Sequence, residues 1–214
     1  VITGETAAAD IVAMTRPDIV VNGISGAAGF LPSLQAVRQG SVLALANKES
    51  LVIGGAFLTQ EARRHRATLI PVDSEHSAVF QCLAGERPEE VSRIFLTASG
   101  GPFRTRPKET FPDITPEEAL SHPTWSMGKR ITIDSATMMN KGLEIIEAYW
   151  LFGVDLSRIQ VVVHPQSIVH SMVEFRDMSI KAQLGVPDMR SAIAYALSWP
   201  SRMELDLKPL DPAA

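Results

Sequence analysis

The sequence predicts an α/β fold, and two observations support that prediction. Short β-branched runs alternate with helical patterns through the first third of the chain, which is typical of parallel βαβ units. From Pro71 onward the pattern changes to strands, helices and one long irregular segment, which indicates a second α/β part with a mixed sheet. The 214 residues are enough for one large domain or two small ones.

In the first part, strands are expected at 19–22, 42–46 and 68–72, with helices at 30–38 and 50–64 between them. Ligands bind at the carboxyl ends of parallel strands. Asn47, Lys48 and Glu49 directly follow the second of these strands. The spacing of Gly23, Gly26 and Gly29 after the first strand is explained equally well by close helix–strand packing.

In the second part, a helix is expected at 77–83 and a strand at 91–97. The segment 99–125 has only a weak helical piece at 116–120, and irregular segments of that length are usually functional lids or disordered linkers. A short strand is expected at 131–133. Ser135 is placed to N-cap a helix in which Met139, Leu143, Ile146 and Trp150 recur at helical spacing. A strand at 159–163, a hairpin at 168–184 and a helix at 188–199 complete the chain.

Composition excludes several classes of protein. The residues are 45% hydrophobic and 21% charged, as in ordinary globular proteins. The net charge of −4 argues against nucleic-acid binding. No apolar run approaches the roughly 18 residues of a membrane span, and no signal peptide is evident. One cysteine, Cys82, cannot form an internal disulfide or a zinc–thiolate cluster, and its apolar neighbours indicate a packing role.

Two carboxylates follow the third predicted strand. Asp73 and Glu75 are two residues apart, and extended backbone would point both side chains the same way. Adjacent carboxylates repel each other, so they need a cation or a shared proton. Oxygen ligands of this kind suit Mg²⁺ or Mn²⁺. The alternative is a helix N-terminus that carries acidic groups.

A second cluster lies at the start of the helix after residue 135. Lys141 and Glu144 are one turn apart and share a face that differs from the apolar stripe. A solvated ion pair would explain that spacing. The density of anion-binding groups near the helix start, with Ser135 and Asn140 beside Lys141, points to a ligand site. The residues of this stretch alone do not decide between the two.

The long irregular segment contributes further candidates. Ser99 precedes two glycines and could offer a hydroxyl and backbone N–H groups to a phosphate, although a plain tight turn explains the same residues. Trp125 and Met127 in a loop either cover a bound substrate or pack on the sheet. The residue pattern does not decide whether His164 or His170 is catalytic or structural.

Taken together, these motifs resemble the 1-deoxy-D-xylulose 5-phosphate reductoisomerase family. The similarity is carried, in the family's order and over nearly the whole chain, by the segments 45–52, 71–76, 99–103, 122–128, 134–144 and 163–167. The resemblance implies that 1-deoxy-D-xylulose 5-phosphate is rearranged and reduced to 2-C-methyl-D-erythritol 4-phosphate, with NADPH and Mn²⁺ or Mg²⁺ as cofactors, in isoprenoid precursor synthesis.

The resemblance also implies a role for particular residues. The metal ligands would be Asp73, Glu75 and Glu144. The residues that contact the substrate would be Lys48, Ser74, Glu75, Ser99, His122, Trp125, Ser135, Asn140, Lys141 and Glu144. Those with a catalytic role would be Lys48, Glu75, His122, Glu144 and His170. The residues that contact NADPH would be Asn47, Glu49 and Gly128.

The resemblance further implies a domain arrangement. Residues 1–70 would be a remnant, the C-terminal half, of a Rossmann-like NADPH-binding domain. Residues 71–214 would form the catalytic and dimerisation domain, with a lid at about 99–128. The family's Gly-rich phosphate loop has no match before Ile19, and its C-terminal helical domain has none either. We therefore expect the central, catalytic portion of a longer protein.

The expected partners are a small phosphorylated sugar and a second copy of the chain, which the hairpin at 168–184 would contact; no nucleic acid or membrane is expected. The expected compartment is the bacterial cytoplasm or the plastid stroma. Two alternatives remain: a truncated fragment that binds metal and substrate and dimerises without turnover, and a cofactor-free metal lyase or aldolase that uses the same carboxylates.

Overall fold

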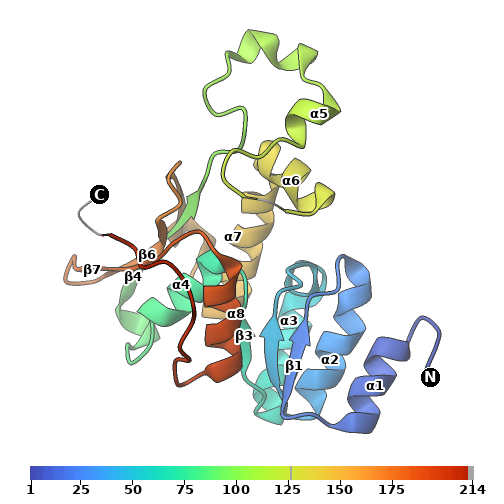
Figure 1. Ribbon diagram of the computed structural model, residues 1–214. Helices are drawn as coiled ribbons and strands as arrows, with labels where there is room; N and C mark the ends of the chain where they lie inside the picture. The colour runs from blue at the N-terminus through green and yellow to red at the C-terminus, as the bar shows by residue number, and fades with distance from the viewer. Residues whose placement is uncertain (126, 212–214) are drawn as a thin grey trace.

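The computed structural model describes residues 1–125 and 127–211. It contains a three-stranded parallel sheet and a four-stranded mixed sheet with helices packed around both (Figure 1). The predicted α/β class with a parallel part and a mixed sheet is therefore confirmed. The predicted domain boundary between residues 70 and 71 stays a prediction. Ser126 in the predicted lid and residues 212–214 lie outside the described residues.

The parallel sheet has the order β1-β2-β3, with β1 at Ile19–Asn22, β2 at Val42–Leu45 and β3 at Leu69–Pro71. Helices α2 (Phe30–Arg38) and α3 (Glu49–His65) connect these strands. An additional helix, α1 (Ala7–Thr15), precedes β1 and packs on α2. The sequence patterns predicted the three strands and two of these helices, but not α1.

Both faces of the parallel sheet are covered. Leu43 and Leu45 of β2 are fully buried in an apolar cluster formed with α1, α2 and α3. Ala44, which points the opposite way in the pleat, packs with Ile70 and with Ala196 of the last helix, α8 (Met189–Ser198). The chain therefore returns at its C-terminal end to cover the sheet with which it began.

The mixed sheet has the order β5-β4-β6-β7, with β4 at Val91–Ala98, β5 at Ile159–Val163, β6 at Val169–Phe175 and β7 at Ile180–Leu184. Strand β5 runs parallel to β4, while β6 and β7 form the predicted antiparallel hairpin. Helices α4 (Ser74–Cys82) and α7 (Met139–Phe152) pack an apolar core with this sheet. Cys82 is buried in that core, as its apolar neighbours indicated.

The segment after β4 extends away from both sheets before the chain returns (Figure 1). It contains a six-residue 3-10 helix, Lys108–Asp113, and the four-residue helix α5, Pro116–Ala119. Thr115 and Glu118 form a capping box on α5, which fixes the start of that short helix. Helix α6 (Lys129–Ala136) then leads back to α7. That the segment 99–128 acts as a lid stays a prediction, and we use the word lid for this segment below.

Three local predictions were wrong. Residues 131–133 lie inside α6 and not in a strand; the hydroxyl of Thr132 donates to the carbonyl of Gly128 one turn earlier, an arrangement that lets a β-branched residue sit in a helix. Ser135 lies inside α6, and α7 instead begins after Met138, which has a left-handed backbone. Helix α4 begins at Ser74 rather than Ser77, with Asp73 as its N-cap.

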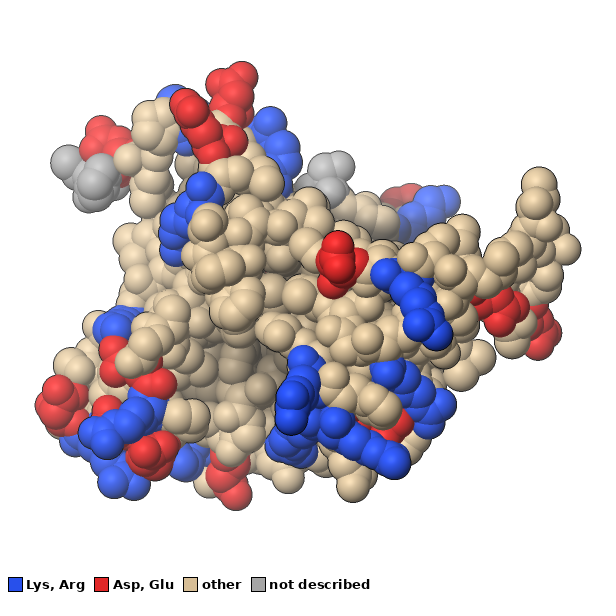
Figure 2. Space-filling model, turned by 90° about the horizontal axis from the view of Figure 1, so that it is seen from below, with Lys and Arg blue, Asp and Glu red and all other residues tan. Residues whose placement is uncertain are grey.

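The surface shows mixed charge. On the face drawn in Figure 2, basic and acidic side chains lie close to one another around a hollowed area without charged side chains. Within residues 1–125 and 127–211, every helix is too short or too polar to cross a lipid bilayer.

Two consecutive glycines allow α3 to pack closely. A Cβ on Gly55 would lie 2.2 Å from the Trp150 ring of α7, and one on Gly54 would lie 2.4 Å from the Phe30 ring of α2. Such contacts are far inside van der Waals distance. The absence of side chains at these two positions therefore allows α3 to contact both neighbouring helices.

We predict that Gly55→Ala destabilises the fold by about 1–3 kcal/mol, because the added methyl group forces Trp150 to move. Gly142→Ala in α7 is the matched control, since the nearest atom to its Cβ would be 3.8 Å away. The control should be neutral or up to about 1 kcal/mol more stable through helix propensity. Urea unfolding of both variants measures the difference; equal stabilities would contradict the close packing of α3 on α7.

Candidate active site

One cavity of about 240 Å³ gathers most of the predicted site residues. It lies where α4, the carboxyl end of β4, the lid, α6 and α7 meet. Its wall includes every residue predicted to bind metal or substrate, together with His170: Lys48, Asp73, Ser74, Glu75, Ser99, His122, Trp125, Ser135, Asn140, Lys141, Glu144 and His170. Residues up to 122 positions apart in the chain therefore share one cavity. The roles assigned to them stay predictions.

The three predicted metal ligands lie together. Asp73, Glu75 and Glu144 each offer a carboxylate oxygen, and these oxygens lie within 4.8 Å of one another. The proximity is as predicted, but the reason given for it was wrong. Asp73 and Glu75 are not side by side on a strand, because Asp73 caps α4 by accepting a hydrogen bond from the backbone N–H of Glu75. Glu144 reaches the same point from α7.

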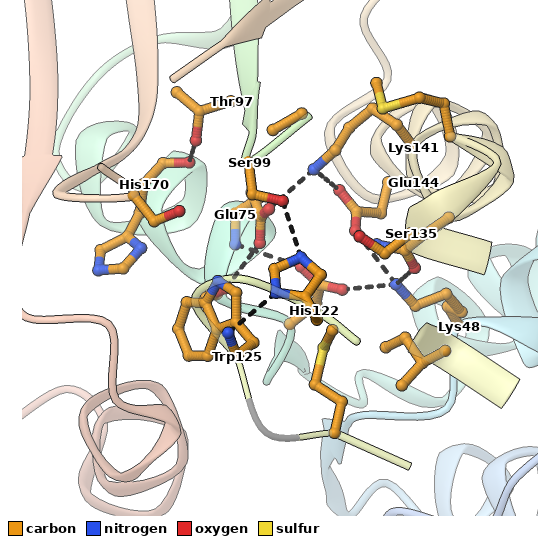
Figure 3. A pocket seen from close by; sticks show the side chains of 18 of the residues that line it. Lys48, Glu75, Thr97, Ser99, His122, Trp125, Ser135, Lys141, Glu144 and His170 are labelled. Atoms are coloured by element: carbon orange, nitrogen blue, oxygen red, sulfur yellow. Dashed lines mark hydrogen bonds and ion pairs between the residues drawn. The ribbon is translucent and has the colours of Figure 1, made fainter. Parts of the chain in front are cut away.

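Two lysines neutralise these carboxylates (Figure 3). The Nζ of Lys48 donates to Asp73 at 2.8 Å and lies 3.3 Å from an oxygen of Glu144. The Nζ of Lys141 donates to Glu75 at 2.8 Å and also pairs with Glu144. Both lysine side chains are less than 10% exposed. The alternative interpretation of Lys141 and Glu144 as a solvated ion pair is therefore wrong.

The burial of α7 explains why that alternative failed. Met139 and Ile146, two members of its apolar stripe, are exposed. The most deeply buried face of the helix instead carries Lys141, Glu144 and Glu147. Burying ionised groups costs free energy unless they are paired. A helix that turns its charged face inward therefore indicates a site at that face rather than a packing surface.

The carboxylates differ in their electrostatic surroundings. Burial alone would raise the pKa of Asp73, but Lys48, His76 and Lys141 together outweigh burial and hold that pKa well below its usual range. Burial raises the pKa of Glu75 to about 7, with help from the negative charge of Glu144 and against the effect of Lys141. A further cation beside Glu75 would favour its ionised form.

The two lysines remain protonated despite their burial. Burial lowers the pKa of a buried ammonium group, but the charge of Asp73 raises that of Lys48, and the charge of Glu144 raises that of Lys141. In both cases the nearby carboxylates outweigh burial. The cavity therefore contains fixed positive as well as fixed negative charge.

A second cluster of ionisable side chains shares Asp73 with the first. His76 of α4 and Glu147 of α7 are completely buried, and both belong to a cluster with Asp73. Burial alone would lower the pKa of His76, yet the charges of Glu147 and Asp73 raise it to about 9. Burial raises the pKa of Glu147 to about 7 against the effect of His76. Neither residue was given a role from the sequence, although His76 lies three positions after the predicted ligand Asp73, and Glu147 three positions after Glu144.

The opposite wall presents hydrogen-bond donors. The Nδ1 of His122 accepts from the backbone N–H groups of Thr124 and Trp125, so in the neutral ring Nε2 carries the proton. Nε2 lies 2.9 Å from the Ser99 hydroxyl, to which it donates. Ser99 also accepts from the backbone N–H of Gly101. Its own hydroxyl proton is thereby directed toward a ligand. Burial lowers the pKa of His122, which favours this neutral form.

Other predicted substrate residues contact the charged cluster instead. The Oδ1 of Asn140 accepts from Lys48 at 2.7 Å, while its Nδ2 donates to Glu144. The hydroxyl of Ser74 donates to Glu75 at 2.6 Å. Asn140 and Ser74 therefore orient the carboxylates and Lys48 in the structure.

His170 lies across the cavity from Lys141 and Glu144 in the view of Figure 3. Burial lowers the pKa of its ring. The backbone carbonyl of His170 accepts from the hydroxyl of Thr97. The other histidine left open, His164, does not line this cavity; its Nε2 accepts from the backbone N–H of Ile168.

The three predicted NADPH contacts, Asn47, Glu49 and Gly128, lie outside the cavity wall. The Nδ2 of Asn47 donates to the carbonyls of Ile24 and Gly26 and so holds the glycine-containing loop after β1. Glu49 pairs with Arg130 at 3.1 Å, two residues after Gly128. Asn47, Glu49 and Gly128 therefore form a second locus, which lies next to that loop and outside the cavity wall.

Much of the cavity's apolar lining was not predicted from the sequence, apart from Met127. These residues carry no charged group that a pattern would mark. They are Ala46, Ala98, Ile131, Met138 and Met189. An apolar wall opposite charged groups suits a small ligand that has a carbon skeleton and polar ends.

Comparison with known proteins gives consistent results. Residues 1–55 match the family model described as 1-deoxy-D-xylulose 5-phosphate reductoisomerase, and residues 69–152 match the model of that protein's C-terminal domain. The chain is 59% identical over 194 residues to the 1-deoxy-D-xylulose 5-phosphate reductoisomerase of Prosthecochloris aestuarii, covering 91% of this chain and 51% of the relative. It is 56% identical over 211 residues to that of Chlorobaculum tepidum, covering 99% and 55%.

Solved structures agree. One DOX-P reductoisomerase in complex with NADPH, fosmidomycin and magnesium superposes with a TM-score of 0.92 at 44% identity, covering 97% of this chain and 53% of that one. The Zymomonas mobilis reductoisomerase in complex with NADPH gives 0.90 at 49% identity, with the same coverage. The chain spans about half the length of the relatives it matches. From these matches and this fold, the chain belongs to the 1-deoxy-D-xylulose 5-phosphate reductoisomerase family.

Proposed function

We propose that this chain carries the metal- and substrate-binding part of an NADPH-dependent reductoisomerase. The reaction would convert 1-deoxy-D-xylulose 5-phosphate into 2-C-methyl-D-erythritol 4-phosphate. The names of the relatives support this proposal, as do the related structures that contain NADPH, fosmidomycin and magnesium. They favour it over the fragment and lyase alternatives.

One observation supports the proposal most directly. A single cavity is lined by three clustered carboxylates, by two buried lysines, and by the hydroxyl of Ser99 and the ring of His122. A phosphorylated sugar fits this lining, because its oxygen atoms can bind a cation at one end and its phosphate is an anion at the other.

The carboxylates fit a divalent cation. Asp73, Glu75 and Glu144 supply three oxygen donors within 4.8 Å of one another, which is the donor type that Mg²⁺ and Mn²⁺ prefer. When bound, the ion supplies a Lewis acid that polarises the oxygen atoms of the substrate. Asn140 and Ser74 would hold the carboxylates in place, because their side chains already donate to Glu144 and Glu75.

The remaining residues would bind the substrate and exclude water. Ser99, His122 and Ser135 would donate to the phosphate. Lys141 would add positive charge, since Nζ–phosphate pairs are strong when buried. Trp125, on the lid, would cover the substrate and keep water out during the rearrangement. Lys48, with its ammonium group fixed between Asp73 and Asn140, would contact the substrate's reacting end.

Hydride transfer would involve the second locus. Asn47, Glu49 and Gly128 would contact NADPH, which supplies the hydride. Two contacts support this assignment: Asn47 holds the glycine-containing loop, and Arg130 links Glu49 to the start of α6. The same locus joins the parallel sheet to the lid, so cofactor and substrate would meet there.

We also propose a homodimer that uses the hairpin of β6 and β7. Strand β7 lies at the edge of its sheet, and its Ile180 and Leu184 side chains are about half exposed. Exposed apolar residues on an edge strand favour association with another chain. The bacterial cytoplasm or plastid stroma stays a prediction of the family resemblance.

An assay with 1-deoxy-D-xylulose 5-phosphate, Mn²⁺ and NADPH tests the proposed function. We expect loss of the nicotinamide absorbance at 340 nm that requires both the sugar phosphate and the metal. Metal-dependent substrate binding without turnover would support the fragment alternative instead. Cleavage of the sugar phosphate without NADPH would support the lyase.

We predict that Glu144→Gln lowers Mn²⁺ affinity by about 100-fold or more, because second-sphere changes alone already cost about 10- to 100-fold. The fold should remain, since the amide has the shape of the carboxylate. Isothermal titration with Mn²⁺ and thermal unfolding measure the two effects. Glu61→Gln is the control: Glu61 is also a buried helical glutamate, but it pairs with Arg38 outside the cavity. Wild-type affinity in Glu144→Gln would remove Glu144 from the metal site.

We predict that Lys141→Met raises the KM for the sugar phosphate by about 10- to 100-fold, as expected for the loss of a hydrogen bond to a charged group. Steady-state kinetics at saturating Mn²⁺ and NADPH isolate this effect. Lys181→Met, which removes a lysine paired with Glu86 on the surface, should leave KM unchanged. An unaltered KM in Lys141→Met would contradict a phosphate contact.

A further inference from the structure

The buried pair His76 and Glu147 has no task in the function proposed above. Glu147 is 0% exposed, and neither of its carboxylate oxygens has a hydrogen-bond partner among the described residues. Leaving a buried polar group unsatisfied costs free energy, and a buried carboxylate costs the most. Such a residue needs an explanation in terms of what it faces.

Glu147 faces a histidine that bridges two helices. The Nε2 of His76 lies 2.9 Å from the backbone carbonyl of Glu144 and donates to it. The Nδ1 of the same ring lies 3.2 Å from Asp73 and 3.5 Å from Glu147. One imidazole on α4 therefore contacts the Asp73 side chain on one side and the backbone of Glu144 in α7 on the other.

The two ends of this bridge differ. The Nε2 of His76 donates to the Glu144 carbonyl, whereas Nδ1 lies within ion-pair distance of Asp73 and Glu147 and makes no hydrogen bond among the described residues. Asp73 and Glu147 therefore face the same ring nitrogen. Asp73 also accepts from Lys48 and from the backbone N–H of Glu75. The Glu147 carboxylate thus fixes the plane of the His76 ring, and the ring in turn fixes the Asp73 carboxylate.

We propose that Glu147 is a positioning residue for the metal centre, acting through His76 to hold Asp73 and the Glu144 backbone in the relative placement that a divalent cation needs. This inference rests on the proposed metal site and deepens it. Outer groups that orient metal ligands change metal affinity by about 10- to 100-fold when they are removed. The role is distinct from ligation, because Glu147 would act on the ligand Asp73 through the Nδ1 of His76, which both carboxylates face.

The same three residues could in principle hold a second ion, since Asp73, His76 and Glu147 also bring their donor atoms within 4.8 Å. The hydrogen bond of His76 to the Glu144 carbonyl favours positioning, because it ties this cluster to the backbone of a ligand in the first cluster. The number of ions bound distinguishes the two arrangements.

The test measures Mn²⁺ binding by isothermal titration and by the loss of the free-Mn²⁺ electron paramagnetic resonance signal. Wild type should bind one ion per chain. Glu147→Gln keeps the shape and removes the charge, and it should bind the ion about 10-fold more weakly or worse. Its thermal unfolding midpoint should be no lower than that of wild type, because the variant removes a buried carboxylate without a hydrogen-bond partner. Glu147→Asp, which restores the charge, should recover part of the affinity. Glu61→Gln serves as the matched buried control and should bind Mn²⁺ as wild type does.

A double-mutant cycle shows whether Glu147 acts through His76. If it does, combining Glu147→Gln with His76→Asn should weaken Mn²⁺ binding no more than His76→Asn alone, because residues in one chain of contacts are not additive. Independent, additive effects would overturn the proposal. So would unchanged Mn²⁺ affinity in folded Glu147→Gln, or two ions in wild type that fall to one in that variant.

Turnover separates this inference from the proposed function. At saturating Mn²⁺, kcat in Glu147→Gln should return toward wild type, since the defect lies in ion affinity; a kcat that stays low would overturn a positioning role.

If wild type binds one Mn²⁺ but shows no NADPH-dependent turnover, the proposed function fails while the binding results above still decide the role of Glu147. If wild type binds no Mn²⁺, the inference fails with the metal site. If Glu147→Gln does not fold, Glu147→Asp in the same cycle decides the outcome.

Discussion

The site depends on the compensation of buried charge. Lys48 and Lys141 donate to three carboxylates that would otherwise repel one another within 4.8 Å. Removing one member would leave an uncompensated buried charge, which typically costs about 3–5 kcal/mol. Replacing such a group of charges with apolar residues is often neutral or stabilising. Stability alone therefore does not explain the arrangement, and a ligand that needs both signs of charge does.

The fold brings these charges together through three helices and the ends of two strands. Asp73 lies where β3 passes into α4, Lys48 lies where β2 passes into α3, and Glu144 comes from α7 on the far side. Helix α7 packs on α3 through Gly55 and Trp150. The metal cluster and the close packing of these helices are therefore linked, because the contact that sets the distance between α3 and α7 also places Lys48 beside Glu144.

Local patterns predicted most of the fold. The parallel strands, the hairpin and the helices α2, α3 and α8 follow from hydrophobic periodicity and turn residues. Helix α1 was missed, and residues 131–133, three consecutive β-branched residues, were assigned to a strand. In the structure the backbone N–H and the hydroxyl of Thr132 both donate to the Gly128 carbonyl, as in a helix. Such contacts depend on the path of the chain and are not visible in residue type.

The candidate site was predicted more fully from family resemblance than from local chemistry. Local chemistry placed Asp73 and Glu75 together for a wrong geometric reason, and it left a solvated ion pair and a ligand site equally open for Lys141 and Glu144. Periodicity assumes that a helix buries its apolar stripe, but α7 leaves Met139 and Ile146 of that stripe exposed. His76 and Glu147 gave no signal at all, since a lone histidine and a helical glutamate are common on surfaces. Their burial appears only when α4 and α7 are packed.

The central claim is that Asp73, Glu75 and Glu144 hold one divalent cation. Anomalous diffraction from crystals soaked in Mn²⁺ tests it most directly, because the signal locates the ion without reference to activity. The account predicts one strong peak about 2 Å from an oxygen of each of the three carboxylates. A peak between Asp73, His76 and Glu147 instead, or well-ordered carboxylates with no peak among them at saturating Mn²⁺, would contradict it.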